Sequence, residues 1–204
     1  MRINKKKFIY LISPNKISKR FYYNLKLLLK TGKIKYFQLR LKKYSLNNKI
    51  LIGRKIKNIC NKNKVKFLVN DDPQLALRLC ADGCHLGQKD MNIKEAKKII
   101  GKKIIGVTCH NSLRLAKKAL KYKPSYLAFG ALQPSKTKKT KYVADIKIIG
   151  KIKKITETPV VVIGGINSED YKNLLLNNVN FLAISGYIWN NKKYKPFEAL
   201  ERLK

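Results

Sequence analysis

Short apolar runs, rich in β-branched and aromatic residues, alternate along the chain with longer segments whose apolar residues recur every three or four positions. The short runs are typical of buried parallel strands, and the longer segments are typical of helices that cover them. The predicted strands are Phe8 to Ile12, Ile34 to Leu41, Lys66 to Asn70, Gly83 to Leu86, Ile104 to Thr108, Tyr126 to Gly130, Val160 to Ile163 and Phe181 to Ser185. Eight alternating units in 204 residues favour an α/β fold, a single-domain (β/α)8 TIM barrel over residues 1–204.

The segments between the strands carry helix start and stop signals. One helix is predicted over Ser18 to Lys30, and another over Ser168 to Leu176 with Ser168 as its N-cap. An open doubly wound sheet is the alternative fold. It is disfavoured because the first strand is not followed by the glycine-rich sequence that binds dinucleotides.

Polar side chains stand at the ends of the predicted strands, where barrel enzymes carry their chemistry. At the end of the second strand, Gln38, Arg40 and Lys42 are spaced by two, so their side chains point to one side of the sheet. An Arg that binds two oxygens at once and a compact Lys charge together suit a diphosphate. The alternative is that these cations pair with acids of the protein itself.

Two acidic residues follow neighbouring strands in a chain that holds only 11 acids against 47 basic residues. Asp71 ends the third strand, and Asp90 follows the fourth. Mg²⁺ is usually held by one or two carboxylates together with waters and phosphate oxygens, so this pair is predicted to bind Mg²⁺. Asp72, which precedes Pro73, is predicted to cap the next helix.

A second anion site is predicted further along the chain. Ser135, Thr137 and Lys138 interleave hydroxyl and ammonium groups, as a loop that wraps an anion would; a solvated surface loop is the alternative. Gly165 and Ser185 follow the last two strands, where barrels often bind a phosphate through backbone N–H groups. His85 lies on a strand among apolar residues and is predicted to be a hydrogen-bonded core residue instead of a general base.

The formal net charge of +36 invites a nucleic-acid-binding interpretation. The lysines, however, are spread through nearly every segment, as an AT-rich genome would impose on any protein. No run approaches the ~18 apolar residues needed to cross a bilayer, so no membrane partner and a cytoplasmic location are expected. The four cysteines lack paired spacing and are expected to be free, buried thiols.

The order of these motifs resembles the thiamine phosphate synthase family from Tyr10 to Asn190. The strings that carry the resemblance are Gln38–Lys42, Asn70–Asp72, Asp82–Asp90, Gly106–His110, Ser135–Lys138 and Ile163–Ile166. The resemblance implies a transferase that joins hydroxymethylpyrimidine diphosphate to a thiazole phosphate, or its carboxylated form, and releases pyrophosphate with the help of Mg²⁺. In such a reaction pyrophosphate leaves first and the thiazole nitrogen captures the pyrimidine-methyl cation. The protein then needs charge stabilisation and orientation and no nucleophile of its own.

The resemblance also implies roles for individual residues. The pyrimidine diphosphate would be bound by Gln38, Arg40, Lys42, Asn70, Thr108 and Lys138. Catalytic charge stabilisation would come from Arg40, Lys42 and Lys138, and Asp71 and Asp90 would carry Mg²⁺. The thiazole phosphate would be bound by Ser135, Thr137, Gly165, Ile184 and Ser185.

Two other functions remain as alternatives. One is a thiazole tautomerase of the same fold, which isomerises its substrate and needs no diphosphate site. The other is a basic nucleic-acid-binding protein, although no specific nucleic-acid motif is present. The expected partners are the two small-molecule substrates, and a homo-oligomer is left open.

Overall fold

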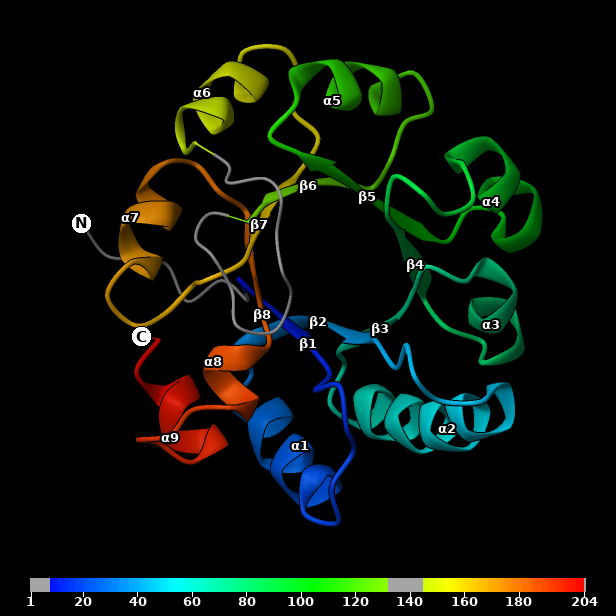
Figure 1. Ribbon diagram of the computed structural model, residues 1–204, viewed down its shortest axis with the longest axis vertical. Helices are drawn as coiled ribbons and strands as arrows, with labels where there is room; N and C mark the ends of the chain where they lie inside the picture. The colour runs from blue at the N-terminus through cyan, green and yellow to red at the C-terminus, as the bar shows by residue number, and fades with distance from the viewer. Residues whose placement is uncertain (1–7, 132–144, 204) are drawn as a thin grey trace.

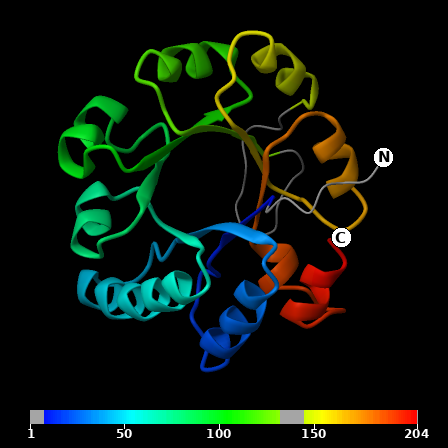
Figure 2. The same ribbon diagram turned by 180° about the vertical axis from the view of Figure 1, so that it is seen from behind.

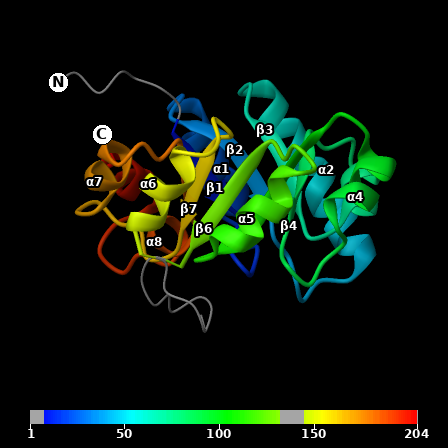
Figure 3. The ribbon, with the colours of Figure 1, turned by 90° about the horizontal axis from the view of Figure 1, so that it is seen from above.

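The computed structural model describes residues 8–131 and 145–203. Within these ranges, eight parallel strands pair in chain order, and the last strand pairs with the first to close a barrel. Helices surround the ring of strands on all sides (Figures 1 and 2), and the strands run tilted inside that ring (Figure 3). The predicted (β/α)8 barrel is therefore confirmed.

The elements follow one another in strict alternation until the end of the chain. The strands are β1 (Ile9–Ile12), β2 (Ile34–Leu39), β3 (Lys66–Asn70), β4 (Gly83–Leu86), β5 (Ile104–His110), β6 (Tyr126–Gly130), β7 (Val160–Ile163) and β8 (Phe181–Ile184). The helices are α1 (Phe21–Lys30), α2 (Leu46–Lys62), α3 (Pro73–Arg78), α4 (Ile93–Ile100), α5 (Leu113–Leu120), α6 (Lys147–Lys153), α7 (Tyr171–Leu176), α8 (Gly186–Trp189) and α9 (Pro196–Glu201). None of the described helices is both long enough and apolar enough to cross a bilayer.

Strand β2 ends two residues earlier than predicted, at Leu39. The reason is a side chain from the neighbouring strand end: the backbone N–H of Arg40 donates to Ser13 Oγ at 2.8 Å instead of to a strand carbonyl. Strand β5 runs two residues further than predicted, and its pairing with β6 is irregular between Thr108 and His110.

The predicted starts of two helices are wrong. The carbonyl of Ser18 accepts from the backbone N–H of Phe21 and forms a single turn ahead of the helix. Helix α1 therefore begins at Phe21 and not at Ser18. Ser168 does not cap α7, because the side-chain oxygen of Asn167 accepts two backbone N–H groups ahead of the helix. The helix then begins at Tyr171 without a side-chain cap.

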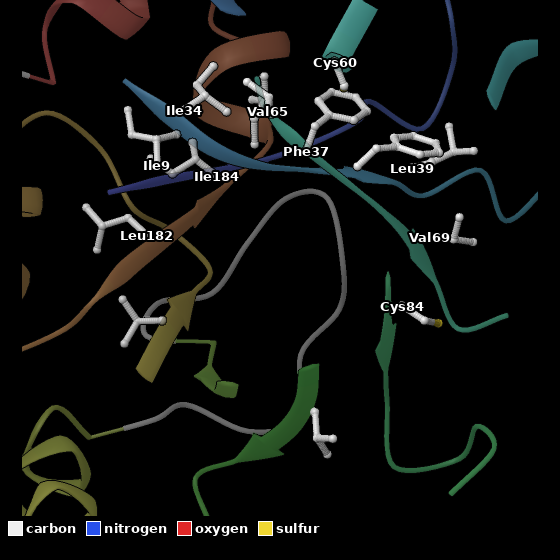
Figure 4. Packing of buried hydrophobic residues seen from close by; sticks show 14 of the residues in the cluster. Ile9, Ile34, Phe37, Leu39, Cys60, Val65, Val69, Cys84, Leu182 and Ile184 are labelled. Carbon is white, nitrogen blue, oxygen red and sulfur yellow. The ribbon is translucent and has the colours of Figure 1, made fainter. Parts of the chain in front are cut away.

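Alternation along the strands divides the core into two layers. Leu39, Val69 and Cys84 lie on the outer side of the strand ring, between the strands and the helices (Figure 4). Tyr10 and Tyr126 belong to a separate cluster formed by inward-facing residues of the strands. Such a division is the ordinary construction of a closed barrel, whose interior is filled with side chains.

One glycine makes the inner layer fit. A Cβ atom on Gly106 would lie 1.8 Å from Cζ of Tyr126, so the ring of Tyr126 occupies the space that any side chain on Gly106 would need. Because Gly106 of β5 has no side chain, the ring of Tyr126 on β6 can pack against the β5 backbone inside the barrel.

The four cysteines are free, as predicted, but their burial differs from expectation. Cys60, Cys84 and Cys109 are buried, whereas Cys80 is exposed. Cys80 adopts a φ of 47° in the turn after α3, and that turn lies at the surface.

An ionic cluster lies beside the starts of β3 and β4 and joins them to α2. The carboxylate of Asp82, just before β4, accepts from Lys57 at 2.7 Å, from Lys66 at 3.1 Å and from the backbone N–H of Phe67 at 2.9 Å. Burial by itself raises the pKa of Asp82, but these three donors outweigh burial and hold the pKa below its ordinary value. Asp82 thus joins α2, β3 and β4 through a carboxylate whose charged form these contacts favour.

We expect Asp82→Asn to lower the free energy of unfolding at neutral pH by roughly 1–3 kcal/mol, because a charge-assisted cluster loses its anion. Since the folded-state pKa is lowered, the carboxylate contributes stability above the unfolded pKa and loses it as pH falls through the folded pKa. Urea unfolding at neutral and acidic pH should therefore show the difference between wild type and variant shrinking in acid. Glu169→Gln, at an exposed acid, is the control; a pH-independent difference for Asp82→Asn would contradict the assignment.

Candidate active site

The end of β2 carries the first part of the site. Gln38 is only 2% exposed, and its Nε2 donates to the hydroxyl of Tyr10 at 2.6 Å. Arg40 is held twice, through its backbone N–H to Ser13 Oγ and through Nη1 to Asn15 Oδ1 at 3.1 Å. Both contacts come from the end of β1 and the loop that follows it, so the neighbouring strand positions the predicted diphosphate-binding residues.

Lys42 reaches across to the next strand end. Its Nζ lies 3.0 Å from Oδ2 of Asp71, and the two side chains are 56% and 26% exposed. Lys42 therefore pairs with an acid of the protein itself, as the alternative interpretation of this strand end predicts. The backbone of Asp71 has a φ of 67° and its N–H donates to the carbonyl of His85 at 2.8 Å, which turns this carboxylate out of the strand direction.

Asp71 and Asp90 lie close enough that the carboxyl group of each shifts the pKa of the other. Burial raises the pKa of Asp71, but its interactions with Asp90 and Lys42 outweigh burial and lower the pKa overall. Burial and the neighbouring carboxyl group of Asp71 both raise the pKa of Asp90. Asp90 Oδ2 also accepts from the backbone N–H of Gly87 at 2.7 Å.

Two carboxyl groups this close repel one another when both are ionised, and a cation bound between them relieves that repulsion. Among the described residues there is no group of three or more side chains of the types that hold a metal by themselves. Mg²⁺ does not require such a group, since one or two carboxylates suffice when waters and phosphate oxygens complete the shell. The donor set of Asp71 and Asp90 therefore fits Mg²⁺ bound jointly with a phosphorylated substrate.

Asp72 has the structural role predicted for it. Its Oδ1 accepts from the backbone N–H of Leu75 at 2.9 Å, and Pro73 occupies the first turn of α3. Beside these residues lies a cavity of about 250 Å³, on the helix side of the β2 and β3 ends. It is lined by Leu39, Leu41, Lys42, Lys49, Val69, Asn70, Asp71, Asp72 and Leu75. Asn70 and Asp71 thus border this cavity.

Thr108 lies on β5 and is connected to the interior of the barrel. Its Oγ1 lies 2.8 Å from Nε2 of His85, and Nδ1 of His85 lies 2.9 Å from the hydroxyl of Tyr126. The prediction that His85 is a hydrogen-bonded residue of the core is confirmed. Gln88 donates to the backbone carbonyl of Thr108, which ties the loop after β4 to this strand end.

The structure describes three of the residues predicted for the second anion site, Gly165, Ile184 and Ser185. They lie at the ends of β7 and β8. Gly165 has a φ of 72°, which turns the chain immediately after β7. Ser185 Oγ donates to the carbonyl of Ser13 at 3.2 Å. The side chain of Ile184 is buried in the layer between strands and helices, so a substrate contact of Ile184 would involve its backbone. Ser13 contacts both Ser185 and Arg40, and so links the two predicted anion sites.

The sequence-based site is thus brought together along one end of the barrel. Gln38 lies near the end of β2, and Arg40 and Lys42 follow that strand. The residues of the next three strand ends continue the arc, namely Asn70, Asp71, Asp90 and Thr108. Ser135, Thr137 and Lys138 lie outside the described residues.

Three residues connected to the site are not singled out by the sequence: Tyr10, Ser13 and Tyr126. The rule that functional residues close a strand does not find the two tyrosines, because Tyr10 lies within β1 and Tyr126 begins β6. Strand alternation offers a signal, because Tyr10 stands two residues before Ile12 and both face the interior.

Comparison with known proteins agrees with this geometry. A family model described as "Thiamine monophosphate synthase" matches residues 9–188. The thiamine-phosphate synthase of Pelagibacter ubique (strain HTCC1062) is 63% identical over the whole of both chains, and that of Rhodospirillum centenum (strain ATCC 51521 / SW) is 36% identical over 90% of this chain and 89% of its own. Thiamine phosphate pyrophosphorylase from Pyrococcus furiosus, a solved structure, superposes with a TM-score of 0.85 at 28% identity, covering 98% of this chain and 94% of its own. The chain belongs to the thiamine monophosphate synthase family.

Proposed function

We propose that this chain couples hydroxymethylpyrimidine diphosphate with a thiazole phosphate to form thiamine phosphate and pyrophosphate. Membership of the family makes the chain an enzyme of the transferase class. The observation that carries the choice of substrates is the gathering of Arg40, Lys42 and the acid pair Asp71 and Asp90 at three consecutive strand ends. Such a group binds a diphosphate and a divalent cation at the same time.

The residues present would act mainly on the leaving group. When the bond between the pyrimidine methylene carbon and the diphosphate oxygen breaks, its electron pair goes to the oxygen. Arg40 and Lys42 would stabilise that charge, and Lys138 is proposed to join them. Mg²⁺ held by Asp71 and Asp90 would supply further charge neutralisation. The lone pair of the thiazole nitrogen then forms the new carbon–nitrogen bond.

Orientation of the two substrates is the second task of the protein. Gln38, Asn70 and Thr108 are proposed to hold the pyrimidine on the β2–β5 side of the barrel. The thiazole phosphate is proposed to lie against Ser135, Thr137, Gly165, Ile184 and Ser185. Since Ser13 contacts both sides, the two sites share a strand end, and neighbouring sites bring the reacting atoms close at low entropic cost.

The experiment is a coupling assay with purified protein. We expect thiamine phosphate and pyrophosphate to appear in equal amounts when both substrates and Mg²⁺ are present, and neither to appear when one substrate is omitted or EDTA is added. Turnover of a thiazole carboxylate phosphate without Mg²⁺ or the pyrimidine diphosphate would instead identify a tautomerase. Salt-sensitive binding of nucleic acid without coupling would identify the third alternative.

A further inference from the structure

A continuous series of hydrogen bonds crosses the interior of the barrel. It joins one residue from each of five strands, in the order Gln38, Tyr10, Tyr126, His85 and Thr108. The four links measure 2.6, 2.8, 2.9 and 2.8 Å. Under the proposed function, both ends of this interior array contact the pyrimidine substrate, while its three central residues have no role in the chemistry described above.

The array is enclosed and tightly packed. Tyr10 and Tyr126 are each only 1% exposed. The imidazole of His85 stacks on the ring of Tyr126 with centroids 5.7 Å apart and planes 11° apart, and Gly106 leaves the space that this ring fills. Burial raises the pKa of both tyrosines, so their hydroxyl groups stay protonated and each has one proton to donate.

One proton per hydroxyl group gives the array a direction. With every hydroxyl proton used inside the array, donation from Gln38 Nε2 to Tyr10 leaves Tyr10 to donate to Tyr126, and Tyr126 to donate to Nδ1 of His85. A neutral imidazole that accepts at Nδ1 carries its proton on Nε2 and donates to Thr108 Oγ1. The hydroxyl proton of Thr108 is then the donor that this end of the array offers to a ligand.

The opposite direction would satisfy the same groups but present different atoms to the substrate. Thr108 would then donate to Nε2, the proton of His85 would lie on Nδ1, and the side-chain carbonyl of Gln38 would accept from Tyr10. The amide NH₂ of Gln38 would face the ligand in place of its carbonyl oxygen. The tautomer of His85 therefore reports which face of Gln38 is presented.

We propose that Tyr10, Tyr126 and His85 are positioning residues that hold the Gln38 amide with its carbonyl oxygen toward the substrate. A carbonyl oxygen accepts from the amino group of an aminopyrimidine, and it repels the oxo group of the corresponding oxopyrimidine. The array thereby selects the aminopyrimidine diphosphate. This inference rests on the proposed function for its substrate, but the direction of the array does not.

The direction is tested by ¹⁵N NMR of the free protein, without any turnover. The chain has only two histidines, so His110→Asn, a change that a φ of 51° tolerates well, assigns the remaining imidazole signals to His85. We expect the neutral Nε2–H tautomer. The Nδ1–H tautomer would overturn the proposal, whatever the coupling assay gives.

Selectivity is tested with two variants and a matched control. Tyr10→Phe removes the acceptor that fixes Gln38, and Tyr126→Phe breaks the link to His85. Tyr36→Phe removes a hydroxyl group from the same aromatic cluster but leaves every link of the array in place. The measurement is the ratio of kcat/KM for the amino- and oxopyrimidine diphosphates.

We expect this ratio to fall roughly tenfold or more in Tyr10→Phe and Tyr126→Phe and to stay unchanged in Tyr36→Phe. Equal ratios in all three variants would overturn the positioning role. A uniform loss of stability would lower both kcat/KM values together and leave the ratio unchanged, so it would also count against the proposal. If wild-type protein coupled neither substrate, the proposed function would fail, while the tautomer measurement would still decide the direction.

Discussion

Replacing Asp90 by Asn is expected to lower the rate of Mg²⁺-dependent coupling by about 100- to 1,000-fold, with little change in the fold. The substitution keeps the volume of the side chain and an oxygen that can accept from Gly87 N–H, a bond of 2.7 Å in the structure. It removes the second negative charge of the acid pair formed with Asp71. Without that charge the pair loses its affinity for a divalent cation, and the departing pyrophosphate loses its counter-charge.

The measurement is the initial rate as a function of Mg²⁺ concentration, with thermal unfolding to check the fold. The matched control is Asp72→Asn, which makes the same chemical change near the acid pair. Asp72 caps α3 through Leu75 N–H, and Asn caps helices about as well as Asp. This control should keep its rate and its Mg²⁺ dependence. An unaltered Mg²⁺ dependence in Asp90→Asn would remove the metal assignment.

Replacing Arg40 by Ala is expected to lower kcat/KM for the pyrimidine diphosphate by about 100-fold. Arg40 is held by Ser13 and Asn15, so its guanidinium is oriented before the substrate arrives. The loss should be greater than for a Lys substitution at the same position, because Lys keeps the charge but cannot bind two phosphate oxygens at once.

The control for this change is Arg54→Ala, at an exposed position on α2. Both variants reduce the net charge of +36 by one, so they weaken the general attraction for anions equally. Any difference between them measures the local contact of Arg40. Equal kinetics for the two variants would show that Arg40 acts only through the overall positive field.

Much of the site follows from rules that act over a few residues. Strand alternation places Gln38 toward the interior and Leu39 among the outer side chains, as expected from a spacing of two. The sequence Asp72-Pro73 predicts a capped helix start, and the structure has one. Where a competing local contact exists, the same rules fail, as with Asn167, which takes the N–H groups expected to bind Ser168.

Other features of the site depend on strands that meet only after the barrel closes. Tyr10 and Tyr126 are 116 positions apart, and neither local sequence indicates that their hydroxyl groups meet. The pairing of Lys42 with Asp71 likewise depends on how far β2 and β3 extend.

The sequence by itself determined the order of strands and helices, the end of the barrel that carries the polar residues, and the chemical types gathered there. Periodicity and turn chemistry are local, so they act before any tertiary contact forms. The tertiary structure alone decided which of those residues touch, including the array from Gln38 to Thr108 and the role of Ser13 between two strand ends. Closure and relative register set those contacts, and both depend on how all the strands pack together.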